Sequence, residues 1–269
     1  MTALVDAHCH LQLLVEREGG GAVEAALEAS AAAGVEQVVC AGINLEDSDR
    51  CRVIAESNPG VFFTAGWHPH EPTVPDPAQL RALEELLSHP RAVGVGEIGL
   101  DQYWRPGYHE TPLSVQQRSF ALMLELARAH GLPAVVHDRL SHQEVLAAID
   151  ACPGVRGVMH CMSGDDRHAR RCRERGFVIS FAGNVTYRRN DGIRQAAREV
   201  DPEGYAVETD APFLAPVPHR GRPSIPAHVA DTAREVASLR GVSASLVAEQ
   251  TTRNARRLFA LPAQDRLHA

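Results

Sequence analysis

The chain contains no lysine, and all 27 of its basic residues are arginine. This absence excludes a lysine Schiff base, the lysine of a Walker phosphate-binding loop and a carbamylated lysine bridging two metal ions. The six cysteines are scattered without a Cys-x-x-Cys pair, in a chain too large to need disulfide staples. We therefore expect them to be reduced thiols.

Long apolar runs and an excess of positive charge are also missing. No apolar stretch approaches the ~18 residues of a membrane span, and Asp6 stands where a secretory signal would be apolar. These features predict a cytoplasmic protein that does not associate with a membrane. The net charge of -7 argues against a general DNA-binding protein, because any contact with nucleic acid would need a local basic patch.

Short apolar strands alternate with helical segments along the whole chain. The expected strands are 3–10, 35–41, 61–65, 92–97, 134–137, 157–160, 177–181 and 205–209. Eight such alternations imply parallel pairing with right-handed crossovers. The count and the length of 269 residues predict an α/β fold with a single closed (β/α)8 TIM barrel over 1–269, because no linker interrupts the pattern. An open, doubly wound sheet is the alternative.

Histidines and carboxylates follow most of the expected strands at the carboxyl end. They are His8, His10, His68, His70, Glu97, His137, His160, Glu208 and Asp210. In a barrel these strand ends meet on one rim, where TIM-barrel active sites lie. In an open sheet the same residues would spread along an edge. The distribution therefore favours both the barrel and a metal site at its mouth.

The first strand carries two of these histidines one residue apart. Side chains alternate between faces in a strand, so Asp6, His8 and His10 are expected to point the same way. For this motif alone, ordinary strand-end histidines are the alternative to metal ligands. Asp6 is then expected to accept a hydrogen bond from a ligating histidine.

The donors exceed the roughly four ligands of one tetrahedral zinc ion, so we expect two divalent metal ions per chain. A central carboxylate can offer one oxygen to each ion of a pair that is ~3.5 to 4 Å apart. We assign His8, His10, Glu97 and Asp210 to one ion, and Glu97, His137 and His160 to the other. Mixed imidazole and carboxylate ligands are compatible with Mg²⁺, Mn²⁺, Zn²⁺ or Ni²⁺.

Several sequence motifs together resemble one known family. They are Asp6-Ala7-His8-Cys9-His10-Leu11, Gly66-Trp67-His68-Pro69-His70, Gly96-Glu97-Ile98-Gly99-Leu100-Asp101, His137-Asp138-Arg139, His160-Cys161-Met162-Ser163-Gly164, Glu208-Thr209-Asp210-Ala211-Pro212-Phe213-Leu214 and Asn254-Ala255-Arg256-Arg257-Leu258-Phe259. In this order the motifs resemble the TatD family of metal-dependent hydrolases, often described as TatD-type deoxyribonucleases. The resemblance implies an amidohydrolase-like barrel with a binuclear divalent metal centre and DNase or 3′-5′ exonuclease activity.

In such a centre, a hydroxide bridging two metal ions would attack a phosphodiester bond. Glu97 would bridge the ions, Asp210 would accept the proton of the attacking water and pass it to the leaving oxygen, and Glu208 would position the water or a histidine. These three residues are the expected catalytic carboxylates.

Four further residues are candidates for substrate binding. His68 and His70 would contact a substrate phosphate or a third ion. Arg139 and Arg220 would clamp phosphate with their planar guanidinium groups, although ordinary surface ion pairs are the alternative for both. We expect Arg188, Arg189 and the remaining histidines, among them His109 and His168, to be solvated.

The expected substrate is nucleic acid, DNA in particular, as single strands or 3′ ends, and the protein is expected to be a monomer or weak oligomer. Trp67 and Trp104 follow strands at the catalytic end, where their rings would stack on bases or pack in loops. Two alternatives use the same residues. One is an amidohydrolase or deacylase that cleaves a C-N or C-O bond with the same metal pair. The other is a metal-stabilised binding protein without turnover.

Overall fold

Eight parallel strands form one sheet in sequence order, from β1 to β8. A computed structural model describes residues 2–263. The strands are β1 (Leu4–Cys9), β2 (Val35–Ala41), β3 (Val61–Ala65), β4 (Ala92–Asp101), β5 (Ala134–Arg139), β6 (Gly157–Met159), β7 (Phe177–Phe181) and β8 (Tyr205–Val207). All eight predicted strands are confirmed. The predicted single domain over 1–269 also includes residues 1 and 264–269, which lie outside the described residues.

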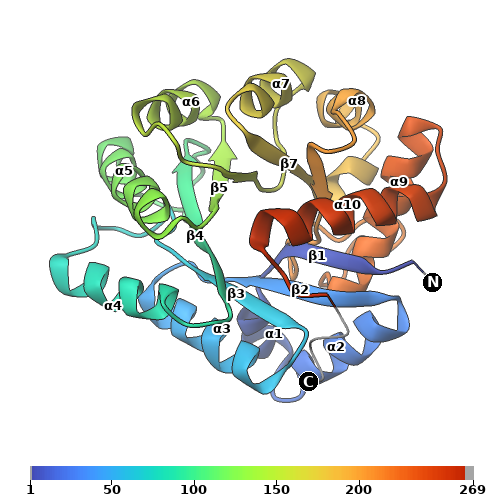
Figure 1. Cartoon of the computed structure of the whole chain (residues 1–269), viewed down its shortest axis with the longest axis horizontal. Coiled ribbons are helices and arrows are strands. Elements are labelled where there is room, and N and C mark those ends of the chain that lie inside the picture. Colours follow the sequence, from blue (N-terminus) through green and yellow to red (C-terminus); the bar gives the residue numbers. More distant parts are fainter. Residues whose placement is uncertain (1, 264–269) are drawn as a thin grey trace.

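Helices follow the strands, and most of them surround the barrel on the outside (Figure 1). They are α1 (Leu11–Glu18), α2 (Ala22–Ala32), α3 (Leu45–Ser57), α4 (Pro77–Leu87), α5 (Leu113–His130), α6 (His142–Ala151), α7 (Asp166–Glu174), α8 (Asp191–Glu199), α9 (Val229–Arg240) and α10 (Ala244–Phe259), with the 3₁₀ helices η1 (Gly183–Thr186) and η2 (Pro226–His228). Local sequence sets several ends. Asp76 and Gln79 form a capping box that starts α4, and Gly131 ends α5 with a φ of 65°.

Apolar side chains pack on both faces of the sheet. Inward-facing strand residues form one cluster, which includes Val39, Phe62, Val135 and Val178. Their sequence neighbours form a second cluster with the helices, which includes Cys40, Phe63, Val136 and Ile179. Leu258 and Phe259 at the end of α10 join the inner cluster, and α10 crosses one end of the barrel in Figure 1. The interior is therefore filled from the amino-terminal end, and the polar strand ends occupy the other.

Two backbone hydrogen bonds join the last strand region to the first. The N–H of Asp210 donates to the His8 carbonyl over 3.0 Å, and the N–H of His10 donates to the Ala211 carbonyl over 2.6 Å. These bonds bring the ends of the sheet together into a nearly closed barrel, so the TIM-barrel prediction is confirmed over the open sheet. The seam lies at the predicted metal ligands.

Two local departures from the sequence expectation shape the site. The pairing of β1 with β2 slips between Asp6 and Cys9, and Ala7 packs inside the barrel while Cys9 packs outside. The expected common direction of Asp6, His8 and His10 therefore holds for the two histidines, whose Nε2 atoms both face Glu97 Oε2, but not for Asp6, because the register slip separates Asp6 from them. The second departure is β4, which continues past Glu97 to Asp101.

Among the residues that the structure describes, no helix combines the length and the apolar composition needed to cross a membrane.

Candidate metal centre

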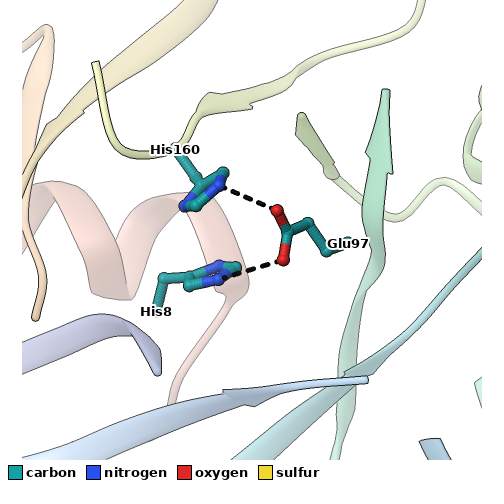
Figure 2. Close-up of side chains that lie close together, drawn as sticks. All are labelled: His8, Glu97 and His160. Atoms are coloured by element: carbon teal, nitrogen blue, oxygen red, sulfur yellow. Dashed lines mark ion pairs between the residues drawn. The ribbon is translucent and has the colours of Figure 1, made fainter. Parts of the chain in front are cut away.

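The Glu97 carboxylate lies at the centre of the barrel mouth, with its two oxygens facing different groups of histidines. Oε1 lies 2.7 Å from His137 Nδ1, 2.9 Å from His160 Nε2 and 3.4 Å from His68 Nε2. Oε2 lies 3.3 Å from His10 Nε2 and 3.6 Å from His8 Nε2. Figure 2 shows this division, with one oxygen directed to His160 and the other to His8. Residues from four other strand ends thus converge on the Glu97 carboxylate.

Asp210 adds a second carboxylate to the His8 and His10 side of the mouth. Its Oδ1 lies 3.5 Å from His10 Nε2 and 3.8 Å from His8 Nε2. The side chain of Asp210 is 13% exposed, whereas that of Glu97 is 4% exposed. Asp210 is therefore the more accessible of the two carboxylates to a molecule that enters the mouth.

The carboxylates and imidazoles of the mouth shift one another's pKa values in opposite directions. Burial alone would raise the pKa of Glu97, but the surrounding imidazoles hold it well below its usual value. Burial would also lower the pKa of His10 and His137, yet their carboxylate partners raise both, that of His137 to about 9. His68, for which burial dominates, has a pKa lowered to about 4. The carboxylates thus stay ionised and attract protons or metal cations to the nitrogens around them.

Two histidines have their tautomers set by a group behind the ring. Nδ1 of His10 lies 2.9 Å from the Ala41 carbonyl, which can only accept, so Nδ1 donates and Nε2 faces Glu97 without a proton in the neutral ring. Nδ1 of His160 faces Glu208 Oε1 at 3.2 Å, and that oxygen also accepts the Cys161 N–H. Both rings therefore direct a ligand-competent nitrogen toward Glu97.

Some buried polar atoms of the mouth have no hydrogen-bond partner within residues 2–263. They include His8 Nδ1 and Glu208 Oε2. Groups of donor atoms close enough to share an ion include His8, Glu97 and His160; His8, His10 and Asp210; and His68, Glu97 and His137. The donor set of buried imidazoles and carboxylates with unsatisfied atoms fits divalent cations.

Asp6 does not play the part expected for it. Its carboxylate accepts hydrogen bonds from the backbone N–H of His8 and from the backbone N–H and hydroxyl of Thr209. The prediction that Asp6 accepts from the ring of a ligating histidine is therefore wrong. Asp6 instead ties the first strand to the segment that carries Glu208 and Asp210.

Asp101 is a site residue that the sequence analysis did not single out. Its Oδ2 lies 2.9 Å from His70 Nε2, 3.3 Å from His137 Nε2 and 3.2 Å from the Tyr108 hydroxyl. The ring of His109, expected to be solvated, stacks on His70 with centroids 4.3 Å apart. The apolar residues after Glu97 indicate that β4 continues to Asp101, four residues beyond the expected end of the strand. This continuation could have identified Asp101 as another polar residue at the carboxyl end of a strand.

The two predicted phosphate clamps both lie against aromatic rings. The Arg139 guanidinium lies 3.8 Å from the Tyr103 ring centroid and donates to the Tyr108 hydroxyl over 2.6 Å. Arg220 lies 3.9 Å from the Tyr187 ring centroid. Neither guanidinium makes an ion pair with a described residue, so the alternative of ordinary surface ion pairs does not hold for them.

The two tryptophans differ in burial, and one of the outer histidines is buried. Trp67 is buried and donates from Nε1 to the Thr73 carbonyl over 2.8 Å, so it packs in a loop. Trp104 is 70% exposed. His168 is buried, with Nε2 2.9 Å from Asp138 Oδ2, so the expectation that it is solvated is wrong.

The fold and the site together define a TIM barrel with a candidate metal centre, because histidines and carboxylates converge at the carboxyl ends of its strands. Residues 5–260 match the family model for TatD-related DNases. The chain therefore belongs to the TatD-related DNase family, and the family expected from the motifs is confirmed.

Individual relatives agree with this assignment. The chain is 36% identical to the Escherichia coli K12 protein named as an uncharacterized metal-dependent hydrolase, YcfH, over 97% of each chain. It is 32% identical to a protein of Klebsiella pneumoniae named 3′-5′ ssDNA/RNA exonuclease TatD, over 86% of this chain and 89% of that one. A crystal structure of the TatD homologue YJJV from Escherichia coli superposes with a TM-score of 0.88 at 27% identity, over 96% and 98% of the two chains.

Proposed function

We propose that this protein is a metal-dependent phosphodiesterase that removes nucleotides from the 3′ ends of single-stranded nucleic acid. The observation that carries the proposal is the Glu97 carboxylate, whose two oxygens face two separate groups of imidazoles. The name of the exonuclease relative supplies the substrate class.

Two divalent cations would fit between the donor atoms. We propose that His8, His10 and Asp210 hold one, that His137 and His160 hold the other, and that Glu97 contacts both; the ion count and these assignments are part of the proposal. Bound divalent cations would supply a water of lowered pKa and would offset the charge that develops on phosphate oxygens.

Two carboxylates of the chain, Asp210 and Glu208, would support proton transfer during hydrolysis. The histidine partners of Asp210 lower its pKa against the effect of burial, so its carboxylate is ionised near neutral pH and can accept a proton from an attacking water. The same oxygen can return that proton to the departing sugar oxygen. Glu208 would act through His160, because its Oε1 fixes the orientation of that ring.

Substrate binding would involve residues at the edge of the mouth. We propose that Arg139 and Arg220 contact backbone phosphates, since guanidinium groups match phosphate in geometry and charge. His68 and His70 would contact the phosphate nearest the reacting bond. His68 already lies 3.4 Å from Glu97 Oε1, so an ion contact is its other proposed role.

We place the activity in the cytoplasm, in a monomer or weak oligomer. Support for a reducing compartment comes from the sequence, in which the six cysteines are scattered without a Cys-x-x-Cys pair.

The test is hydrolysis of a 5′-labelled single-stranded oligonucleotide with Mg²⁺ or Mn²⁺, with Glu97→Gln as the matched inactive variant. The proposal predicts a ladder that shortens from the 3′ end in the wild type and none in the variant. Products from an ester or amide panel without oligonucleotide cleavage would instead favour the amidohydrolase or deacylase alternative. Metal binding with no product from any substrate would favour the binding protein.

A further inference from the structure

A hollow of about 870 Å³ lies beside the barrel mouth, between the segment after β7 and the segment after β8. Five arginines line it, which we call the arginine hollow: Arg188, Arg189, Arg194, Arg220 and Arg234. Helices α8 and α9, which carry Arg194 and Arg234, lie side by side at this edge of the barrel (Figure 1).

The arginine hollow concentrates positive charge in a chain whose net charge is -7. Arg194 pairs with Glu235 and Arg234 pairs with Asp231, the two acidic residues of the lining. Within residues 2–263, Arg188 and Arg189 form no ion pair, and both are exposed. Together with Arg220, they leave a cluster of uncompensated guanidinium groups, which attracts anions.

Hydrogen bonds connect the wall of the hollow to the catalytic strand ends. The Tyr187 hydroxyl donates to the Ala215 carbonyl over 3.0 Å, on the segment that follows Asp210. At the other end of the same turn, Asn184 Nδ2 donates to the Met162 carbonyl over 3.3 Å, two residues after His160. The arginine hollow is therefore held next to the His160 and Asp210 side of the mouth.

We infer that the arginine hollow binds the backbone phosphates of the strand beyond the reacting bond, so that single-stranded nucleic acid runs from the metal centre across Arg220 to Arg188 and Arg189. This inference rests on the proposed function and extends it. Separated guanidinium groups along a groove contact successive phosphates without reading sequence. A small ester with a single phosphate, bound at the mouth, has no second phosphate to place against Arg188 or Arg189.

The test compares substrate lengths in the full-length protein. The double variant Arg188→Ala/Arg189→Ala removes two exposed side chains, and the matched control Arg81→Ala/Arg118→Ala removes two exposed arginines from α4 and α5. We expect wild type to cleave an oligothymidylate 12-mer with a lower KM than a dinucleotide. In the double variant Arg188→Ala/Arg189→Ala, called the hollow variant, the KM for the 12-mer should rise most of the way to that for the dinucleotide. The control variant should keep the lower KM for the 12-mer.

Salt dependence gives a second readout. Each phosphate contact on a single strand contributes about 0.7 to the slope of log affinity against log salt. Loss of two contacts should therefore reduce the slope for the 12-mer by about 1.4. An unchanged KM and slope in the hollow variant, with cleavage intact, would overturn the inference while leaving the proposed function in place.

If no nuclease activity is found, a binding measurement still tests whether the arginine hollow contacts phosphates, separately from the proposed exonuclease function. Fluorescence anisotropy of a labelled 12-mer is measured in a Glu97→Gln background with Mg²⁺, with and without Arg188→Ala/Arg189→Ala. Weaker binding in the hollow variant supports the inference even if no nuclease activity is found. Equal binding, or no binding by either protein, overturns it.

Discussion

Replacing Asp101 with asparagine tests whether a buried carboxylate behind the metal centre sets the charge of His137. Burial alone would lower the pKa of His137, but Asp101 and Glu97 raise it from 6.5 to about 9. The folded protein thus favours the protonated ring. In metal-free protein, this contribution to the free energy of unfolding is complete below pH 6.5 and is lost as the pH rises through 9.

A pKa change of this size corresponds to about 3 kcal/mol at most, and the two carboxylates share it. Asp101→Asn should therefore lower the free energy of unfolding by about 1 to 2 kcal/mol at pH 6.5. The deficit relative to wild type should shrink as the pH approaches 9, because His137 is then losing its proton in both proteins.

The assay is urea denaturation in the presence of a chelator, at the acidic and the alkaline end of this interval. The matched control is Asp49→Asn, which removes an exposed carboxylate on α3. Its free energy of unfolding relative to wild type should not change between the two pH values. If the stability deficit of Asp101→Asn is absent at pH 6.5, or is equal at both pH values, Asp101 does not set the charge of His137.

Three further substitutions test the mouth. Glu97→Gln should weaken the binding of both ions by about 10³-fold, since the interaction of two unit charges near 4 Å is worth about 4 kcal/mol at an effective dielectric constant of about 20. The metal content is measured by elemental analysis after dialysis. Two ions still bound with wild-type affinity would contradict this prediction. Glu208→Gln should lower kcat about 10- to 100-fold through the orientation of His160, and a wild-type rate would show that this contact has no role. Arg139→Ala should raise the KM for oligonucleotides about tenfold, as expected for one lost charged hydrogen bond, and steady-state kinetics with unchanged KM would exclude a phosphate contact.

The sequence predicted the strands and the ring of donors because both follow from local rules. Apolar runs fix the buried strands, and the carboxyl ends of parallel strands meet on one rim. His8, His137 and His160 could therefore be assigned to one site although they are far apart in the chain. Their meeting at Glu97 needed no knowledge of loop conformation.

The roles of Asp6, Asp101, Arg188 and Arg189 could not be predicted from the sequence, because they depend on strand register and on contacts with residues far away in the chain. A slip in β1 gave Asp6 a different partner, and the continuation of β4 brought Asp101 behind His137. The hollow formed by Arg188 and Arg189 arises where two loops from separate strands meet, so neither loop alone predicts it. Periodicity carries no information on such contacts.

Anomalous diffraction from a crystal of the protein soaked with Mn²⁺ would show directly whether Glu97 holds two ions. We expect two anomalous peaks, one between Glu97, His8, His10 and Asp210, and the other between Glu97, His137 and His160. A crystal with no peak at Glu97, or with a single ion that touches only one of its oxygens, would contradict this expectation.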